Sequence, residues 1–142
     1  MDNLYQKELL ALARTVRALT ELPAATHSHS VNNPVCGDKI TISVSYKNGA
    51  ITDRHIAADG CALCAAGAGY WYARSEKADA HQLRALKAEM EAYLKDDSPL
   101  VDKDVSSFAP VKALRNRHKC VMLAFEASAD LAQILLAETK SV

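Results

Sequence analysis

The sequence predicts a single domain in which an antiparallel β-hairpin is combined with several helices. Residues 39–46 and 50–58 form two β-like runs separated by Lys47-Asn48-Gly49. Asn-Gly between two such runs is a strong hairpin signal, because both residues tolerate the positive φ of a type I′ turn. Apolar residues at helical spacing recur before and after the hairpin. A chain of 142 residues with 49% hydrophobic residues is long enough to bury one core.

The N-terminal part, residues 1–30, is expected to contain one helix and a mobile loop. Residues 4–19 carry apolar side chains at helical spacing, which predicts an amphipathic packing helix. Residues 21–34 are rich in Pro, Ala, Ser and Asn, which favours a loop. This loop contains His27 and His29, and nothing close in the sequence completes a metal site around them.

The hairpin predicts which residues face each other. If Asn48-Gly49 forms the turn, Tyr46 faces Ile51 and Cys36 faces Cys61 at the open end, with Asp38 beside them. The second run is irregular, because Asp53 and His55 share the face of its apolar residues, so this strand either lies at an exposed edge or has a shifted register. A β-bulge would shift the pairing by one residue.

Four further helices are predicted after the hairpin. Residues 62–72 are uncharged and rich in small residues, which favours a closely packed helix that begins at Cys61. Residues 75–97 form an amphipathic helix whose charges are a solvated face. After an irregular stretch, Pro110 is expected to open a short helix, and the final helix covers residues 121–137 with Cys120 at its start.

Charge and composition exclude several classes of function. Lys plus Arg and Asp plus Glu both number 17, so no net charge attracts nucleic acid or an anionic membrane. The N-terminus lacks the features of a signal peptide, and the uncharged run 60–73 is too short to span a bilayer. We therefore expect a cytoplasmic protein. In that reducing compartment its four cysteines favour metal binding or reactivity over disulfides.

Three cysteines stand at the ends of predicted elements: Cys36 before a strand, and Cys61 and Cys120 at helix starts. With Asp38 they offer three soft ligands and one oxygen ligand, a plausible set for Zn²⁺ or for part of an iron–sulfur cluster. The alternative is three buried structural thiols. A helix N-terminus and the adjacent basic residues His118 and Lys119 favour thiolate at Cys120, which is therefore predicted to be reactive or ligated.

Cys64 lies three residues after Cys61, a Cys-x-x-Cys spacing that also occurs in thiol oxidoreductases. A thioredoxin motif follows a strand of a βαβ unit, whereas no parallel strand is predicted here. Cys64 is therefore interpreted as a core residue, and a spare ligand or a resolving thiol remains the alternative.

Three motifs together resemble the U-type iron–sulfur assembly proteins IscU, SufU and the N-terminal domain of NifU. The motifs are Asn33-Pro34-Val35-Cys36-Gly37-Asp38, Gly60-Cys61-Ala62, and Pro110-Val111-Lys112 followed by Lys119-Cys120-Val121-Met122-Leu123-Ala124. They occur in the family's order, each with its cysteine, and the resemblance covers residues 30–137.

The resemblance implies an α+β fold with a small antiparallel sheet, a possible extra strand and helices packed on it. It places Cys36, Asp38, Cys61 and Cys120 at the family's ligand positions. Lys119 before the third cysteine, where IscU-like members have histidine, and the inserted charged helix 75–97 resemble SufU. The IscU chaperone-docking motif is only partly matched by residues 108–112.

The first functional hypothesis is therefore a SufU-like protein. Cys36, Asp38, Cys61 and Cys120 would bind Zn²⁺, and Cys120, tuned by Lys119 and His118, would accept persulfide sulfur from a cysteine desulfurase. The second is a scaffold that assembles a [2Fe-2S] cluster and passes it to apo iron–sulfur proteins or other assembly factors. A Cys61/Cys64 thiol oxidoreductase and a binding module with inert thiols are alternatives from other classes.

Overall fold

The computed structural model describes residues 3–96 and 105–140. The elements are, in order, α1 (Asn3–Arg17), β1 (His27–Asn32), β2 (Lys39–Lys47), β3 (Ala50–Asp59), α2 (Ala62–Arg74), α3 (Ala80–Asp96), the 3₁₀ helices η1 (Val105–Ala113) and η2 (Arg115–Arg117), and α4 (His118–Lys140). The three strands form an antiparallel sheet in the order β1-β2-β3. The predicted α+β class is confirmed.

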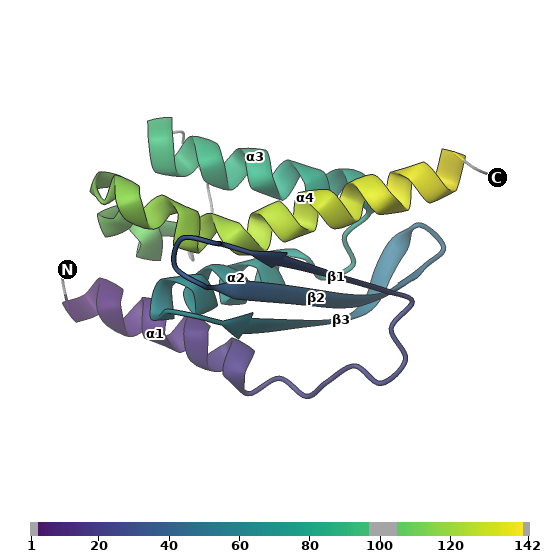
Figure 1. Ribbon diagram of the computed structural model, residues 1–142, viewed down its shortest axis with the longest axis horizontal. Helices are drawn as coiled ribbons and strands as arrows, with labels where there is room; N and C mark the ends of the chain where they lie inside the picture. The colour runs from purple at the N-terminus through teal and green to yellow at the C-terminus, as the bar shows by residue number, and fades with distance from the viewer. Residues whose placement is uncertain (1–2, 97–104, 141–142) are drawn as a thin grey trace.

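The helices pack together beside the sheet (Figure 1). α2 and α4 contact both the strands and each other, α1 packs on α2, and α3 packs on α4 in the opposite direction. The β1–β2 connection and the starts of α2 and α4 all lie at one end of the molecule. This arrangement brings together three segments that are far apart in the sequence.

The extra strand β1 lies within the segment that was predicted to be a mobile loop, so that prediction is wrong for His27–Asn32. β1 pairs with β2 along its whole length. Its half-buried residues alternate with exposed serines, and His27 and His29 pair with Glu138 and Asp130 of α4 at 2.8 and 3.1 Å between Nε2 and the carboxylate oxygen. The strand escaped recognition because histidines stand where inward-facing apolar residues are normally expected.

The hairpin turn is the predicted one, but the register changes along the hairpin. Asn48 and Gly49 have φ of 56° and 80°, and Tyr46 pairs with Ile51 as expected. A bulge then leaves Thr52 unpaired, so Ser45 pairs with Asp53 and the register is shifted by one from there on. The prediction that Cys36 lies directly opposite Cys61 is therefore wrong. The shifted register also explains why Asp53 and His55 did not fit the alternation expected for the second strand.

The helix boundaries follow local capping. α2 starts directly after Cys61, as predicted. α3 starts at Ala80 and not at residue 75, because Asp79 and Gln82 form a reciprocal capping box: Asp79 Oδ1 accepts the Gln82 N–H at 2.8 Å, and Gln82 Oε1 accepts the Asp79 N–H at 2.9 Å. The predicted end of this helix at residue 97 lies outside the described residues.

The stretch before α4 is more regular than predicted. Residues 98–104 of the predicted irregular segment lie outside the described residues, but residues 105–110 belong to η1, and Pro110 lies inside this 3₁₀ helix and does not open a helix. α4 begins at His118, two residues before Cys120. The stretch Arg115–Glu138 is long and apolar enough to cross a membrane, but 61% of its most apolar window is buried inside the protein, as in a core helix.

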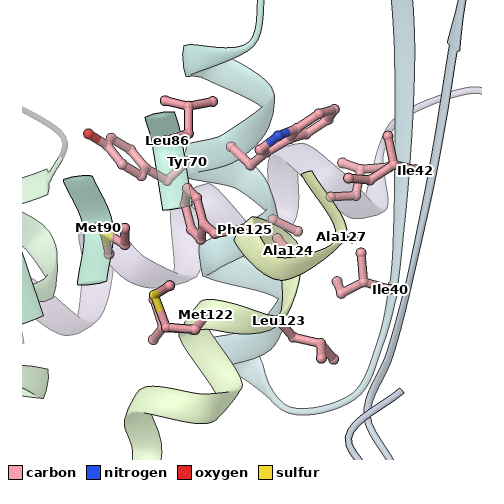
Figure 2. Close-up of a cluster of buried hydrophobic side chains, with 14 of the residues drawn as sticks. Ile40, Ile42, Tyr70, Leu86, Met90, Met122, Leu123, Ala124, Phe125 and Ala127 are labelled. Atoms are coloured by element: carbon pink, nitrogen blue, oxygen red, sulfur yellow. The ribbon is translucent and has the colours of Figure 1, made fainter. Parts of the chain in front are cut away.

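The core lies where α2 and α4 meet the sheet (Figure 2). Ile40 and Ile42 of β2 line one side of the buried cluster, and Tyr70, Phe125 and Met90 line the other. The rings of Tyr70 and Phe125 pack against each other at 6.0 Å between centroids, with their planes tilted by 48°. The close packing predicted for the small residues of α2 is confirmed: a Cβ added at Gly67 would lie 2.5 Å from the carbonyl oxygen of Val121 in α4.

Candidate metal centre

The predicted metal ligands come from three places at one end of the fold. Cys36 is exposed in the β1–β2 connection, and the buried Asp38 directly precedes β2. Cys61 is the N-cap residue of α2, and Cys120 lies in the first turn of α4. The thiol sulfurs of Cys36 and Cys120 and a carboxylate oxygen of Asp38 all lie within 4.8 Å of one another.

Cys61 borders the same cluster. Its Sγ lies 3.8 Å from Asp38 Oδ2, and its backbone N–H donates to Asp38 Oδ1 at 3.3 Å. Cys61 also lies close enough to Cys120 to raise the pKa of that thiol. The structure thus brings together the four side chains that the sequence singled out, although the hairpin register that led to this expectation is shifted.

The loop that carries Cys36 is held by short hydrogen bonds. The Asn33 N–H donates to the Asp38 carbonyl and the Gly37 N–H to the Asn33 carbonyl, both at 2.8 Å, and the Asn33 side chain accepts the Val35 N–H at 3.1 Å. Gly37 takes a φ of 78°, which a residue with a side chain adopts only with strain. Asn33 and Gly37 therefore position Cys36 against Asp38.

Gly60 makes room for the Asp38 carboxylate. A Cβ at position 60 would overlap Oδ1 of Asp38, and the bulge at Thr52 is what brings Gly60 opposite this side chain. Gly60 belongs to the motif Gly60-Cys61-Ala62, but its role beside Asp38 depends on a register that the sequence does not reveal.

Replacing Gly60 with alanine is expected to turn Asp38 out of the cluster and to lower the affinity for Zn²⁺ by about 10- to 100-fold, as for other residues that position metal ligands. The measurement is a competition titration with a chromophoric chelator. Ala58→Gly, which also changes one methyl group but lies in β3 opposite Ile40 and not opposite Asp38, is the control. Equal zinc affinity of Gly60→Ala and wild type would contradict this role for Gly60.

The cluster concentrates acidic groups. Burial, followed by Cys61, Asp38 and Cys36, raises the pKa of the Cys120 thiol to about 12. We expected the helix start and the adjacent basic residues to favour thiolate at Cys120. This expectation is wrong for the protein without a bound metal ion, in which the raised pKa favours the thiol. The negative charges of the cysteine thiolates and of the Asp38 carboxylate would repel one another without a cation between them. A bound cation removes this repulsion and so stabilises the thiolate form of its ligands.

Cys64 lies in the hydrophobic core and outside the cluster. It is fully buried, and burial, followed by Asp38 and Cys61, raises its pKa to about 12. This placement agrees with its interpretation as a core residue one turn into α2. Cys64 is not part of the group of Cys36, Asp38 and Cys120 that lies within 4.8 Å.

The other candidate residues have separate surroundings. His118 Nε2 lies 3.0 Å from the carbonyl oxygens of both Val111 and Lys112, so it carries the proton and anchors the start of α4 on η1. Lys119 is exposed on the helix beside Cys120. His27 and His29 pair with Glu138 and Asp130 of α4. Both carboxylates lie ten or more residues along the helix from Cys120, a separation of at least about 15 Å along the helix axis.

No family model and no curated protein sequence matches the chain. Among solved structures, the N-terminal part of a nitrogen-fixing NifU-like protein from Brucella abortus is similar to this chain, with a TM-score of 0.80 and 25% sequence identity. The match covers 94% of this chain and 95% of that one. A SufU-type scaffold for iron–sulfur cluster assembly from Fervidobacterium islandicum is 17% identical with a TM-score of 0.71, over 86% and 91%. A protein of undescribed function is 19% identical with a TM-score of 0.77, over 94% and 99%.

These neighbours confirm the fold implied by the sequence motifs. The NifU-like N-terminal protein, at 25% identity, also confirms the resemblance to the U-type assembly proteins.

Proposed function

We propose that this chain is a U-type iron–sulfur cluster assembly protein that accepts persulfide sulfur from a cysteine desulfurase at a zinc site of SufU type. The observation that carries the proposal is the convergence of Cys36, Asp38 and Cys120 within 4.8 Å, with Cys61 hydrogen-bonded to Asp38. Three thiols and one carboxylate are a ligand set that suits tetrahedral Zn²⁺.

The donor set supports a cation at this position. Cys61, Asp38 and Cys36 each raise the pKa of Cys120, so the cluster itself supplies no positive charge to hold the thiols as thiolates. Zn²⁺ bound by Cys36, Asp38, Cys61 and Cys120 would supply that charge. Asp38, the single oxygen ligand, would be the most readily exchanged of the four.

The transfer step is a thiol–persulfide exchange. The Cys120 thiolate attacks the outer sulfur of the desulfurase persulfide, a new S–S bond forms at Cys120, and the partner's S–S bond breaks to leave its cysteine as thiolate. No oxidant or reductant is needed. Cys120 is only 7% exposed, so the donor side chain must enter past the exposed Cys36 loop. The charge of Lys119 and the anchoring of α4 by His118 are proposed to tune this thiol.

A second candidate function is a scaffold on which a [2Fe-2S] cluster is assembled and then passed to apo proteins. Its support is the likeness to the Fervidobacterium scaffold protein and the same set of sulfur ligands. Anaerobic purification separates the two functions. Stoichiometric zinc without visible absorbance supports sulfur acceptance, and iron with acid-labile sulfide supports the scaffold.

The experiment that tests sulfur acceptance is persulfide trapping. The zinc-loaded protein is incubated with a SufS-type cysteine desulfurase and L-cysteine, alkylated, and analysed by peptide mass spectrometry. A mass increase of one sulfur on Cys120, absent in Cys120→Ser and retained in Cys64→Ser, is expected. Sulfur found only on other cysteines of the wild type, or transfer that survives Cys120→Ser, would overturn the assignment.

The same variants address the two remaining classes of function. If the Cys64→Ser variant loses both disulfide exchange and sulfur acceptance, the result would favour a Cys61/Cys64 oxidoreductase. A binding module with inert thiols predicts slow alkylation of Cys120 whether or not metal is present. The proposed site predicts alkylation that depends strongly on the metal.

A further inference from the structure

A groove runs along the outer seam between α3 and α4. Three cavities of 540, 460 and 530 Å³ follow one another along it. The first and second share Glu91 and Lys95, and the second and third share Arg84, Lys87 and Ala129, so they are parts of one depression. Figure 1 shows the two helices side by side over most of the length of α4.

The groove has small residues on both helices. Ala88 and Ala92 of α3 and Ala129 and Ala137 of α4 line it, at positions where surface helices commonly carry long polar side chains. Ala88 and Ala92 are four residues apart, so they lie on the same side of α3. Two neighbouring helices with small residues between them leave room for a third helix at a normal interaxial distance.

The groove concentrates positive charge. Its lining contains six Lys or Arg residues and three Asp or Glu residues, whereas the whole chain has a formal net charge of zero. The cations are Arg84, Lys87, Lys95, Lys112, Arg115 and Lys119.

Two of the three groove carboxylates already have a partner within the described part of the chain. Glu91 pairs with Lys95 at 3.2 Å and Asp130 with His29 at 3.1 Å. For the third, Glu126, burial raises the pKa overall, although the nearby Lys87 and Lys119 lower it. With six cations against three carboxylates, the lining of the groove carries a net positive charge.

We propose that this groove binds an acidic amphipathic helix of a partner protein. The groove spans residues 119–137 of α4, which corresponds to about 27 Å and to a helix of about 18 residues. Acidic residues along one flank of such a helix would meet Arg84, Lys87 and Lys95 on the α3 wall, and those at its end would meet Lys112, Arg115 and Lys119. Its small apolar residues would lie on the alanines. This is the helix-in-groove mode of recognition with charge-directed specificity.

The groove ends beside the proposed sulfur-accepting residue. Lys119 lines the first cavity and directly precedes Cys120. A partner docked along α3 and α4 is thus held next to the metal centre without occupying it. The proposal does not depend on which metal the centre holds, because it concerns residues that are not among the four ligands.

The test uses two synthetic helical peptides of about 18 residues. One has glutamates flanking an alanine and leucine face, and the other has lysines in place of the glutamates. Binding to the isotope-labelled protein is followed by NMR. The acidic peptide is expected to shift the amides of Ala88, Ala92 and Ala129, with an affinity that falls as the salt concentration rises, and the basic peptide is expected not to bind.

The variants reverse charge inside and outside the groove. Arg84→Glu with Lys87→Glu is expected to weaken binding of the acidic peptide at least about tenfold. Arg14→Glu with Arg17→Glu, the same change on the exposed face of α1, is expected to leave binding unchanged. The circular dichroism spectra and the zinc contents of both double variants should match those of the wild type. A loss of peptide binding by the groove can then be told apart from a loss of zinc binding.

Several outcomes would overturn the proposal. These are amide shifts spread outside the groove, equal binding of the basic peptide, or equal loss in both double variants. A concentration-dependent dimer in sedimentation that the Arg84→Glu/Lys87→Glu variant abolishes would assign the groove to a second copy of the chain. Cosedimentation with phosphatidylserine vesicles that is lost in the same variant, without binding of the acidic peptide, would assign it to a membrane surface.

Discussion

Replacing Gly67 with alanine is expected to lower the free energy of unfolding by about 2 kcal/mol and to weaken zinc binding at the same time. The new Cβ would lie 2.5 Å from the carbonyl oxygen of Val121, a backbone atom that cannot turn away. Alanine's better helix propensity offsets only about 1 kcal/mol of this overpacking. Because Val121 follows Cys120, any outward shift of α4 moves the thiol away from Asp38.

Gly69 provides the matched control for this prediction. A Cβ at Gly69 would overlap the carbonyl oxygen of Leu12 in α1, so Gly69→Ala also overpacks α2 but displaces a different helix. Urea denaturation should show that both variants are destabilised, and a zinc competition titration should show at least about tenfold lower affinity for Gly67→Ala alone. A similar zinc affinity of the two variants would mean that the α2–α4 contact does not position Cys120.

The second large effect concerns pH. Zinc binds the thiolate, whereas burial and the neighbouring acidic groups raise the pKa of Cys120 to about 12, so this thiol is protonated in the metal-free protein throughout the neutral range. Its proton must leave when the metal binds. Cys120 alone therefore contributes about a tenfold rise in apparent zinc affinity for each unit of pH between about pH 6 and 9.

The comparison of wild type with Cys120→Ser isolates this contribution. The slope of log affinity against pH should be lower by about one in the variant, because serine binds no proton that titrates in this range. Calorimetry in buffers of different ionisation enthalpy gives the number of protons released as an independent measure. An unchanged slope in Cys120→Ser would show that Cys120 is not deprotonated on binding.

The sequence predicted the elements whose physical signals are local. Asn48-Gly49 predicted the turn because only a few residues tolerate two successive positive φ angles. The small residues of α2 predicted a close contact, which Gly67 and Val121 provide. The three cysteines and Asp38 were identified from their positions at the ends of elements and from the family motifs, and the structure places them side by side.

The features that the sequence did not predict depend on long-range pairing. β1 is a strand because it lies between β2 and the carboxylates of α4, and its own composition resembles a loop. The bulge at Thr52 carries no distinct sequence signal, although it decides that Gly60 stands opposite Asp38. The pKa of Cys120 depends on burial and on three acidic neighbours from other segments, which outweigh its local basic residues.

Metal content tests most directly whether Cys36, Asp38, Cys61 and Cys120 hold one metal ion together, as proposed. Wild type and the variants Cys36→Ser, Asp38→Ala, Cys61→Ser, Cys120→Ser and Cys64→Ser are purified anaerobically, dialysed against a weak chelator and analysed for zinc and iron by mass spectrometry. We expect one metal ion per chain in the wild type and in Cys64→Ser, and substoichiometric metal in the other four. Full metal content in any of those four, or its loss only in Cys64→Ser, would contradict the proposed site.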